Sequence, residues 1–201
     1  MSEDQIRSSV KDQELVMRRR KQIIEGAMRL FQEKGFHRTT TREIAKESGF
    51  SIGTLYEYIR TKEDVLFLVC EFVHDRVRDQ LAETISVGNP TMESLRQAIR
   101  QYLYFMDTIQ PEILMLYQET KSLNKEKRQF VLEQEQKVVG MMEELLNVCL
   151  KEKRSAKEIH FLANHIVVSG HMWCFRRWLI QKEFTLDEYV ELQMKQVDCW
   201  L

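Results

Sequence analysis

Residues 39–62, TTTREIAKESGFSIGTLYEYIRTK, contain a short predicted helix with two chemically different faces. At 100° per residue, Leu55 and Ile59 share an apolar stripe. The groups that project away from this stripe are Gly53, Thr54 and Glu57, with Tyr56 between the two faces. A glycine in the first turn of a helix costs up to about 1 kcal/mol relative to alanine, so Gly53 indicates that a partner approaches the backbone closely. A nucleic-acid duplex is such a partner. The alternative is that Gly53 only relieves crowding near the helix cap.

Two short helices must hold this face in place. Thr40 and Glu43 have the spacing of a capping box, which begins the first of them. Gly49 can take the left-handed conformation that ends a helix, and Ser51 caps the next one. The predicted helices therefore run from residue 41 to 48 and from residue 52 to 59. This is the sequence pattern of a helix-turn-helix.

A longer stretch around these helices, residues 24–66, carries a resemblance to a known family. Its features are the apolar face Ala27, Leu30 and Phe31, the helix end Gly35-Phe36, Thr39 to Thr41, Ile44-Ala45, Gly49, the SxGTLYxY core and Lys62-Glu63. Together they resemble the N-terminal DNA-binding domain of the TetR family of bacterial transcriptional regulators. Two positions depart from the family pattern, with Ile59 in place of the usual Phe and Phe50 where Val is common. Both are apolar exchanges that affect packing rather than contact with DNA.

The resemblance implies a set of residues that contact the duplex. These are Thr41, Ser51, Thr54, Tyr56, Tyr58 and Lys62, with Gly53 letting the backbone approach. Hydroxyl groups and a lysine at helix ends suit phosphate oxygens, which position a protein on DNA without reading its sequence. The candidates for base reading are Ile52, Thr54 and Glu57, because a methyl group can pack on thymine and a carboxylate can accept from cytosine N4. For Glu57 the alternative is a solvated carboxylate that pairs with a neighbouring side chain.

The basic charge of the chain is concentrated on this predicted reading domain. The 201 residues carry a net charge of −1, but residues 18–62 hold eleven Lys or Arg and five Glu, a balance of +6. Such a local excess supplies the part of DNA affinity that does not depend on sequence and falls steeply with salt. The run from Arg18 to Lys21 could contact phosphates or the minor groove, or it could simply be solvated.

Amino-acid composition and helix-boundary signals predict an all-α fold. The chain is 43% hydrophobic, has two prolines, and lacks alternating apolar runs with glycine-rich hairpin turns. We predict a disordered N-terminal tail at residues 1–17, a three-helix helix-turn-helix DNA-binding domain at 18–62, and a helical ligand-binding and dimerisation domain at 63–201. The whole chain should contain about nine helices. After residue 60, Thr61 caps predicted helix four, which runs to about Glu83 and is followed by a turn at Ser86 to Asn89. Pro90 or Thr91 opens helix five, which runs to about Ile109, and Pro111 starts helix six. Helix seven runs from Asn124 to about Lys151, Ser155 with Glu158 opens helix eight, and Thr185 with Glu188 opens helix nine.

Cysteine and histidine spacing favours a cytoplasmic protein without a metal site. The four cysteines form no CxxC pair, which fits a reducing compartment. His160, His165 and His171 are separated by five or six residues, whereas two ligands on one helix face need three or four. The charge-free stretch from Phe161 to Phe175 is too short to cross a bilayer. We expect no metal, no cofactor and no membrane partner.

Helix eight is predicted to be apolar nearly all round. Its apolar positions are Leu162, Ile166, Val167, Gly170, Trp173, Phe175 and Leu179, and helix nine stays apolar to Leu201. A second buried surface is implied. The family resemblance implies a homodimer through helices eight and nine, and a two-fold dimer predicts a palindromic operator. The alternative is that helix eight is the central helix of a monomer.

The family resemblance also implies a small-molecule cavity among helices five to eight. Residues able to line it are Tyr102, Phe105, Met106, Met115, Tyr117, Met142, Trp173 and Trp178, although such residues are more often ordinary core. Arg176 and Arg177 need anionic partners wherever they are buried, either acidic side chains or a ligand phosphate or carboxylate. A subset of TetR-like regulators senses acyl-CoA. We therefore expect a small hydrophobic effector such as an acyl-CoA or fatty acid, with a flat aromatic drug-like molecule as the rival.

The predicted function is a ligand-responsive transcriptional regulator that binds a double-stranded DNA operator, most simply as a repressor released by its effector. Activation of transcription is the alternative to repression. An enzyme would need a nucleophile with a base, paired carboxylates or a metal cluster, and none stands at usable spacing. A helical adaptor that binds protein through the same surfaces is the alternative from a different class.

Overall fold

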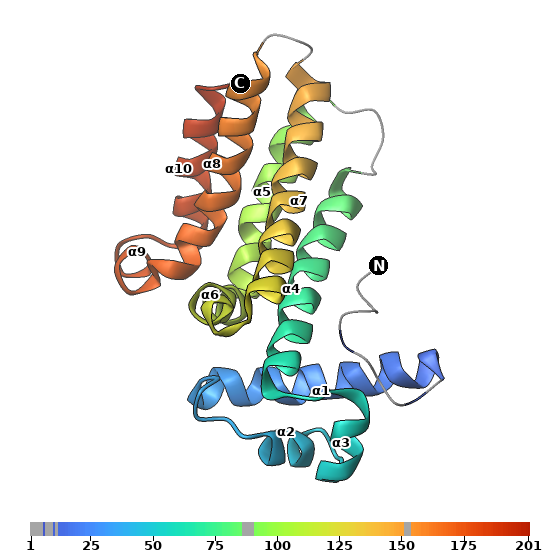
Figure 1. The fold of residues 1–201 in the computed structure, drawn as a ribbon. Coiled ribbons are helices and arrows are strands. Elements are labelled where there is room, and N and C mark those ends of the chain that lie inside the picture. Colours follow the sequence, from blue (N-terminus) through green and yellow to red (C-terminus); the bar gives the residue numbers. More distant parts are fainter. Residues whose placement is uncertain (1–5, 7–9, 11, 86–90, 151–153) are drawn as a thin grey trace. The chain divides into compact units, whose positions relative to one another are not determined.

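The computed structural model describes residues 6, 10, 12–85, 91–150 and 154–201. These residues form ten α-helices and one short 3₁₀ helix, with no strand among them (Figure 1). The helices are α1 (Gln13–Lys34), α2 (Thr41–Glu47), α3 (Ile52–Tyr58), α4 (Lys62–Ile85), α5 (Met92–Thr108), α6 (Gln110–Glu119), α7 (Lys125–Leu150), α8 (Ala156–Phe175), α9 (Arg177–Glu183) and α10 (Leu186–Asp198), and η1 (Thr120–Ser122) follows α6. The predicted all-α class is confirmed.

Contacts divide the chain into two compact units. Unit 1 contains residues 1–73 and 115–131, and unit 2 contains residues 74–114 and 132–201. The helices α4, α6 and α7 each contribute residues to both units. Unit 1 thus holds the predicted reading domain together with the second half of α6 and the start of α7, which differs from a division at residue 62.

In unit 1, the helices α2 and α3 both pack against α1 (Figure 1). The shared core consists of fully or almost fully buried aliphatic and aromatic side chains: Ile23, Ala27, Phe31, Ile44, Leu55 and Ile59. Gly49 has φ +76° after the end of α2, a left-handed conformation that favours glycine. The predicted turn between α2 and α3 is therefore present for its predicted reason.

In unit 2, α5 packs against both α8 and α10. The contact between α5 and α8 is close at Gly170. A Cβ added there would lie 2.7 Å from Met106 Cγ and 2.7 Å from Tyr102 Cε1. The Tyr102 hydroxyl donates a hydrogen bond to the Val167 carbonyl at 3.0 Å, so the two helices are joined by packing and by a polar contact.

Most predicted helix starts are confirmed by their caps. Capping boxes are present at Thr40, Ser155 and Thr185, and Thr91 caps α5. The predicted Ser86 to Asn89 turn and the Pro90 alternative lie outside the described residues. No helix in the described part of the chain is long and apolar enough to cross a membrane.

Two boundary predictions are wrong. First, α1 begins at Gln13, where the Asp12 side chain accepts from the Leu15 N–H at 3.1 Å, so residues 13–17 are helical rather than a disordered tail. The earlier tail falls mostly outside the described residues. Second, predicted helix eight breaks at Arg176, which has φ −103° and ψ 20°, and the chain continues as the separate helix α9. This break brings the number of α-helices to ten.

Candidate nucleic-acid interface

The helix α3 has one buried and one accessible face, as its sequence predicts. Leu55 and Ile59 have no exposed surface, whereas 49% of the Tyr56 surface is exposed. Gly53 and Glu57 are also exposed, and Ile52 and Thr54 are partly exposed. Because α3 is anchored from one side only, its other face is free to contact a partner.

Hydroxyl groups from α2 and α3 meet on this accessible face. Thr41 Oγ1 lies 3.3 Å from the Tyr56 hydroxyl, which links the first residue of α2 to α3. The Ser51 side chain accepts from the Thr54 N–H at 3.0 Å, and the two side-chain hydroxyls also lie 3.0 Å apart. Four of the predicted contact residues are therefore joined in two pairs. Hydroxyls can donate to phosphate oxygens while these contacts fix their positions.

Tyr58 does not belong to this face, which contradicts its predicted contact with the duplex. Only 3% of its surface is exposed, and its ring stacks on Phe50 with centroids 6.4 Å apart. The reason is helical spacing: Tyr58 follows Leu55 by three residues and so shares the inward stripe. The departure of Phe50 from the family pattern is accommodated by the same ring contact.

Gly53 is not required by the packing of the protein itself. A Cβ built on Gly53 would meet only Ser51 Oγ, at the ordinary contact distance of 3.7 Å. Crowding near the cap, the alternative to a close partner, is therefore not supported by the structure. Nothing within the protein therefore requires a glycine at residue 53. Any requirement for glycine must come from a partner outside this chain.

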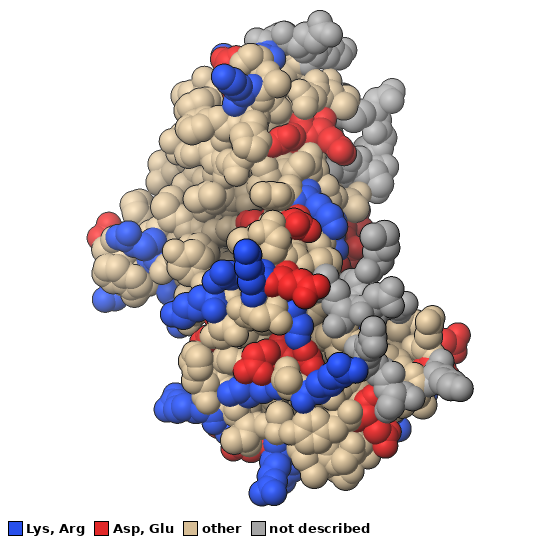
Figure 2. Space-filling model, in the orientation of Figure 1, with Lys and Arg blue, Asp and Glu red and all other residues tan. Residues whose placement is uncertain are grey.

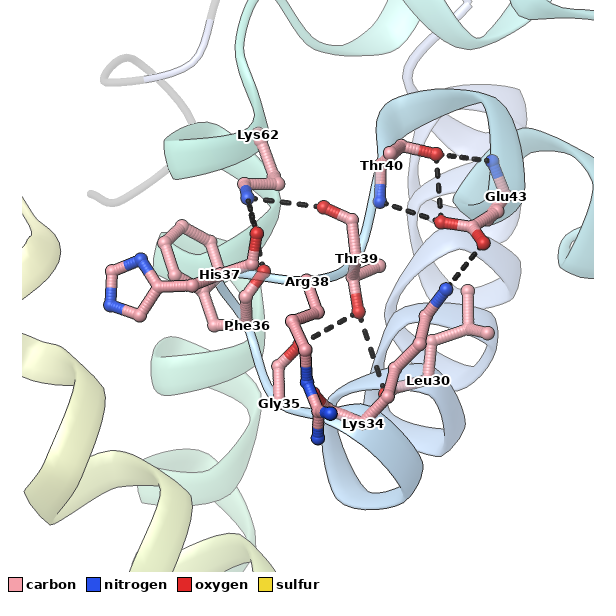
Figure 3. A network of polar contacts seen from close by, with 10 residues as sticks. All are labelled: Leu30, Lys34, Gly35, Phe36, His37, Arg38, Thr39, Thr40, Glu43 and Lys62. Atoms are coloured by element: carbon pink, nitrogen blue, oxygen red, sulfur yellow. Dashed lines mark hydrogen bonds and ion pairs between the residues drawn. The ribbon is translucent and has the colours of Figure 1, made fainter.

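The side chain of Lys62 holds the connection between α1 and α2 (Figure 3). Its ammonium donates to the carbonyl oxygens of Phe36 at 3.0 Å, His37 at 3.3 Å and Thr39 at 3.0 Å. It also lies 4.3 Å from the centroid of the Phe36 ring. An ammonium has three protons, so these carbonyls can use all of them. A phosphate contact by Lys62 stays a prediction, and it would compete with this role.

Next to this connection, Glu43 orders the start of α2 (Figure 3). Its carboxylate pairs with Lys34 and accepts from the Thr40 N–H at 2.9 Å. The hydrogen bonds from Lys34 and Thr40 lower the pKa of Glu43 to about 2. The carboxylate is thus ionised at neutral pH and places negative charge at the helix N-terminus, where it is favourable.

We expect Lys62→Met to destabilise unit 1 by about 2 kcal/mol, because three charge-assisted hydrogen bonds are lost. Chemical denaturation checks this value, with Lys121→Met at an exposed position as the control. DNA affinity should fall as well, but the dependence of log K on log salt should stay within about half a unit of wild type. A slope lower by about one would instead establish the predicted phosphate contact.

A buried ion pair fixes the connection between α3 and α4. The Asp64 carboxylate accepts from the backbone N–H groups of Arg60 at 2.8 Å and Thr61 at 3.0 Å. Its other oxygen binds the Lys127 ammonium of α7, and the two side chains are only 8% and 13% exposed. Burial works against the charged form of Asp64, but Lys127 and these two N–H groups outweigh it, so the pKa of Asp64 lies below its usual value. Sequence reasoning missed this pair because its members are far apart in the chain.

Sequence reasoning also missed Arg42, an exposed cation in the first turn of α2 beside Thr41. Its position next to a predicted contact residue was a usable signal. In contrast, Arg19 from the basic run of α1 lies with its guanidinium carbon 5.1 Å from the Phe50 centroid. Part of that run therefore packs on the reading domain.

The residues predicted to line an effector cavity separate into two groups. Four are buried in unit 2: Tyr102, Met106, Met142 and Trp173. Phe105 is partly exposed, with the Arg76 guanidinium carbon 5.9 Å from its centroid. Met115 is buried but belongs to unit 1. Trp173 Nε1 donates to Asp107 at 2.7 Å, so its polar atom is satisfied inside the protein.

The other group is on the surface, which contradicts its predicted lining role. Tyr117 is 71% exposed and Trp178 is 61% exposed, and Arg176 and Arg177 are exposed too. The break of the helix at Arg176 turns this segment outward, and the Arg176 guanidinium lies over the Trp178 ring at 5.3 Å. Solvated arginines need no anionic partner, so the argument for a ligand phosphate at this pair no longer holds.

Among the residues that the structure describes, no group of three or more His, Cys, Asp or Glu side chains is arranged to hold a metal ion. The described cysteines Cys70, Cys149 and Cys174 are buried, and Cys199 is exposed. Burial raises the pKa of Cys70 to about 12, so this thiol is protonated at neutral pH. A reactive thiolate is not present there.

Comparison with known proteins agrees with this geometry. The family model for bacterial regulatory proteins of the tetR family matches residues 23–69, which include α2, α3 and the start of α4. The HTH-type transcriptional regulator HbdR of Aromatoleum sp. (strain CIB) is 32% identical over 192 residues, covering 94% of this chain and 83% of HbdR. The fold and these matches define a helix-turn-helix transcriptional regulator. The chain belongs to the TetR family.

Solved structures share the fold at lower identity. AibR in complex with isovaleryl coenzyme A and operator DNA superposes with a TM-score of 0.70 at 22% identity, covering 89% of this chain and 97% of that one. A putative fatty acid metabolism regulator of Clostridium perfringens gives a TM-score of 0.75 at 17% identity, covering 90% and 98%. These two comparisons support the all-α architecture over nearly the whole chain.

Proposed function

We propose that this regulator is a repressor that binds a palindromic DNA operator as a homodimer and is released by a small hydrophobic effector. The observation that carries the proposal is the two-sided helix α3, whose accessible face presents Thr54, Tyr56 and a glycine that the protein's own packing does not need. Such a helix can enter a major groove, and a two-fold dimer would place two of them about one helical turn of DNA apart or somewhat more.

The dimer is supported by an apolar surface on α8 and α10. Large apolar side chains on these two helices are strongly exposed: Phe161 at 55%, Val168 at 56%, Met172 at 39% and Leu192 at 49%. The face over α8 and α10 also carries few charged side chains (Figure 2). Several large exposed apolar side chains on the same two helices indicate an interface, and a second copy would bury these helices around a two-fold axis.

We expect Val168→Lys to convert the dimer into a monomer, because a lysine among the exposed apolar side chains of α8 must be buried or must break the contact. Light scattering coupled to size-exclusion chromatography measures the change in mass. Val148→Lys is the matched control, since Val148 is also 51% exposed but lies on α7. A Val168→Lys variant that stays dimeric would contradict an interface at this face.

The effector proposal rests on unit 2 and on the relatives. The buried side chains Tyr102, Met106, Met142 and Trp173 supply an apolar environment. The Clostridium perfringens protein described as a fatty acid metabolism regulator and AibR, solved with isovaleryl coenzyme A, point in the same direction. We therefore propose an acyl-CoA or a related lipid-like molecule. A flat aromatic molecule is the second candidate, because aromatic side chains form part of the same core.

The experiment titrates the purified protein onto the DNA upstream of its own gene, with and without candidate effectors. Binding at nanomolar protein, followed by release with an acyl-CoA, is the expected result. Thermodynamic linkage requires that the operator weakens effector binding by the same factor by which the effector weakens operator binding. In thermal shift, an effector at a hundred times its Kd should add about 2.7 kcal/mol of stability. A response to planar aromatic compounds alone would favour the second candidate, and protein partners without DNA binding would favour a helical adaptor.

A further inference from the structure

Three ionisable side chains from three helices meet in unit 2. Glu135 lies on α7, His74 on α4 and His171 on α8. His74 Nε2 lies 3.3 Å from Oε2 of Glu135, and His171 Nδ1 lies 3.6 Å from Oε1. Each oxygen of one carboxylate therefore faces an imidazole nitrogen, in a unit whose core consists mainly of aliphatic and aromatic side chains.

The charge state of this cluster defines what it can bind. Burial disfavours the charged form of Glu135, but the hydrogen bond with His74 and the electrostatic interactions with His171 and His74 together outweigh it, so the pKa of Glu135 lies below its usual value. Burial lowers the pKa of His171, so this imidazole is neutral at neutral pH. The cluster thus contains an ionised carboxylate beside a neutral imidazole. It can accept a hydrogen bond from a ligand, and it disfavours a second anion.

Glu135 is also the member of the cluster that a ligand can reach. Its side chain is 38% exposed, compared with 5% for His74 and 14% for His171. A carboxylate that keeps exposed surface while two less exposed imidazoles contact it can accept a hydrogen bond from a ligand.

The surroundings of Glu135 are suited to an apolar molecule. Met142 follows Glu135 by seven residues on α7, so the two share a helix face, and Met142 is fully buried. Tyr102 is close enough for the charge of Glu135 to contribute to the raised pKa of its hydroxyl. Both side chains were predicted to line the effector cavity. Glu135 adds a polar acceptor to them.

We propose that Glu135, flanked by His74 and His171, is the polar anchor of the effector site and takes a hydroxyl or N–H donor carried by an otherwise apolar ligand. The inference rests on the proposed effector response and refines it. It predicts that Glu135 selects ligands that carry a hydrogen-bond donor on the ligand body. It also predicts that a free carboxylate of the ligand does not bind next to Glu135.

The test compares two ligands that differ by one hydroxyl, 3-hydroxyoctanoyl-CoA and octanoyl-CoA, by isothermal titration calorimetry. The wild type should bind the hydroxylated thioester about tenfold more tightly, since a hydrogen bond to a charged acceptor is stronger than a neutral one. Glu135→Leu should remove this preference, and Glu135→Gln, which keeps the shape and a neutral acceptor, should give an intermediate ratio. Equal affinities in the wild type, or an undiminished preference in Glu135→Leu, would overturn the proposal.

Glu143→Leu is the matched control. Glu143 is also on α7, with Oε1 2.5 Å from Nδ1 of His160 on α8, but its partner His160 is 69% exposed. This variant should keep the hydroxyl preference. If the wild type binds neither thioester, the acyl-CoA part of the proposed function is wrong, and 4-propylphenol against propylbenzene then tests the anchor alone. No preference for the phenol would contradict it. Binding of upstream DNA by Glu135→Leu without ligand separates this outcome from a failure of the regulator function itself.

Discussion

Gly53→Ala is expected to weaken operator binding about 100-fold while leaving the fold intact or slightly more stable. A methyl group at this position meets only Ser51 Oγ at 3.7 Å within the protein, so folding imposes no penalty. Replacing glycine by alanine in a helix gains up to about 1 kcal/mol. On DNA, the same methyl group would stand between the backbone of α3 and the duplex. A tenfold loss per half-site, about 1.4 kcal/mol, becomes about 100-fold for a dimer that makes the contact twice.

The matched control is Gly140→Ala on α7. A Cβ there has no neighbour within 4 Å, so this variant should gain similar helix stability and keep its DNA affinity. Fluorescence anisotropy gives the affinities and thermal unfolding gives the stabilities. Retained DNA binding by Gly53→Ala would show that no duplex backbone approaches α3 at this residue.

Lys127→Met is expected to cost about 3 kcal/mol of unfolding free energy, because it leaves the buried Asp64 carboxylate without its cation. The loss should extend to DNA binding, since Asp64 holds the Arg60 and Thr61 N–H groups directly after the reading helix. Lys127→Arg should recover most of the lost unfolding free energy and most of the lost DNA affinity. Lys125→Met, at an exposed position in the same helix turn, serves as the control.

The effect of Lys127→Met should depend on pH in a defined direction. The pKa of Asp64 is lowered in the folded protein, so its pairing stabilises the fold above the unfolded value of about 3.9, and this contribution is lost as the pH falls through the folded pKa. The difference between wild type and Lys127→Met in urea denaturation should therefore shrink from pH 7 towards pH 3. A difference that stays constant over this range would assign the loss to packing rather than to charge.

The reading helix could be predicted from sequence because its determinants are local. Thr40 and Ser51 cap helices through contacts three residues away, and helical spacing alone separates Leu55 from Tyr56. The contact expected of Tyr58 came from the family resemblance alone. Tyr58 follows Leu55 by three residues, and the structure buries it.

Two polar contacts between helices could not be predicted, because they join distant parts of the chain. Lys127 is 63 residues from Asp64, and Glu135 is 61 residues from His74. No local pattern marks such pairs, since a single Lys or Glu on a helix is most often solvated. The surface position of Arg176 was missed for a related reason. Apolar side chains resume at Trp178 and Leu179 directly after the two arginines, so the apolar spacing predicts one continuous helix across Arg176, where α8 ends.

Footprinting on the DNA upstream of the protein's own gene tests the central claim most directly. The account predicts two protected half-sites, related by a two-fold axis and centred about one helical turn apart or somewhat more, that disappear with Gly53→Ala and persist with Gly140→Ala. Protection of a single half-site, or an unchanged footprint with Gly53→Ala, would contradict a dimer that reads DNA through the accessible face of α3.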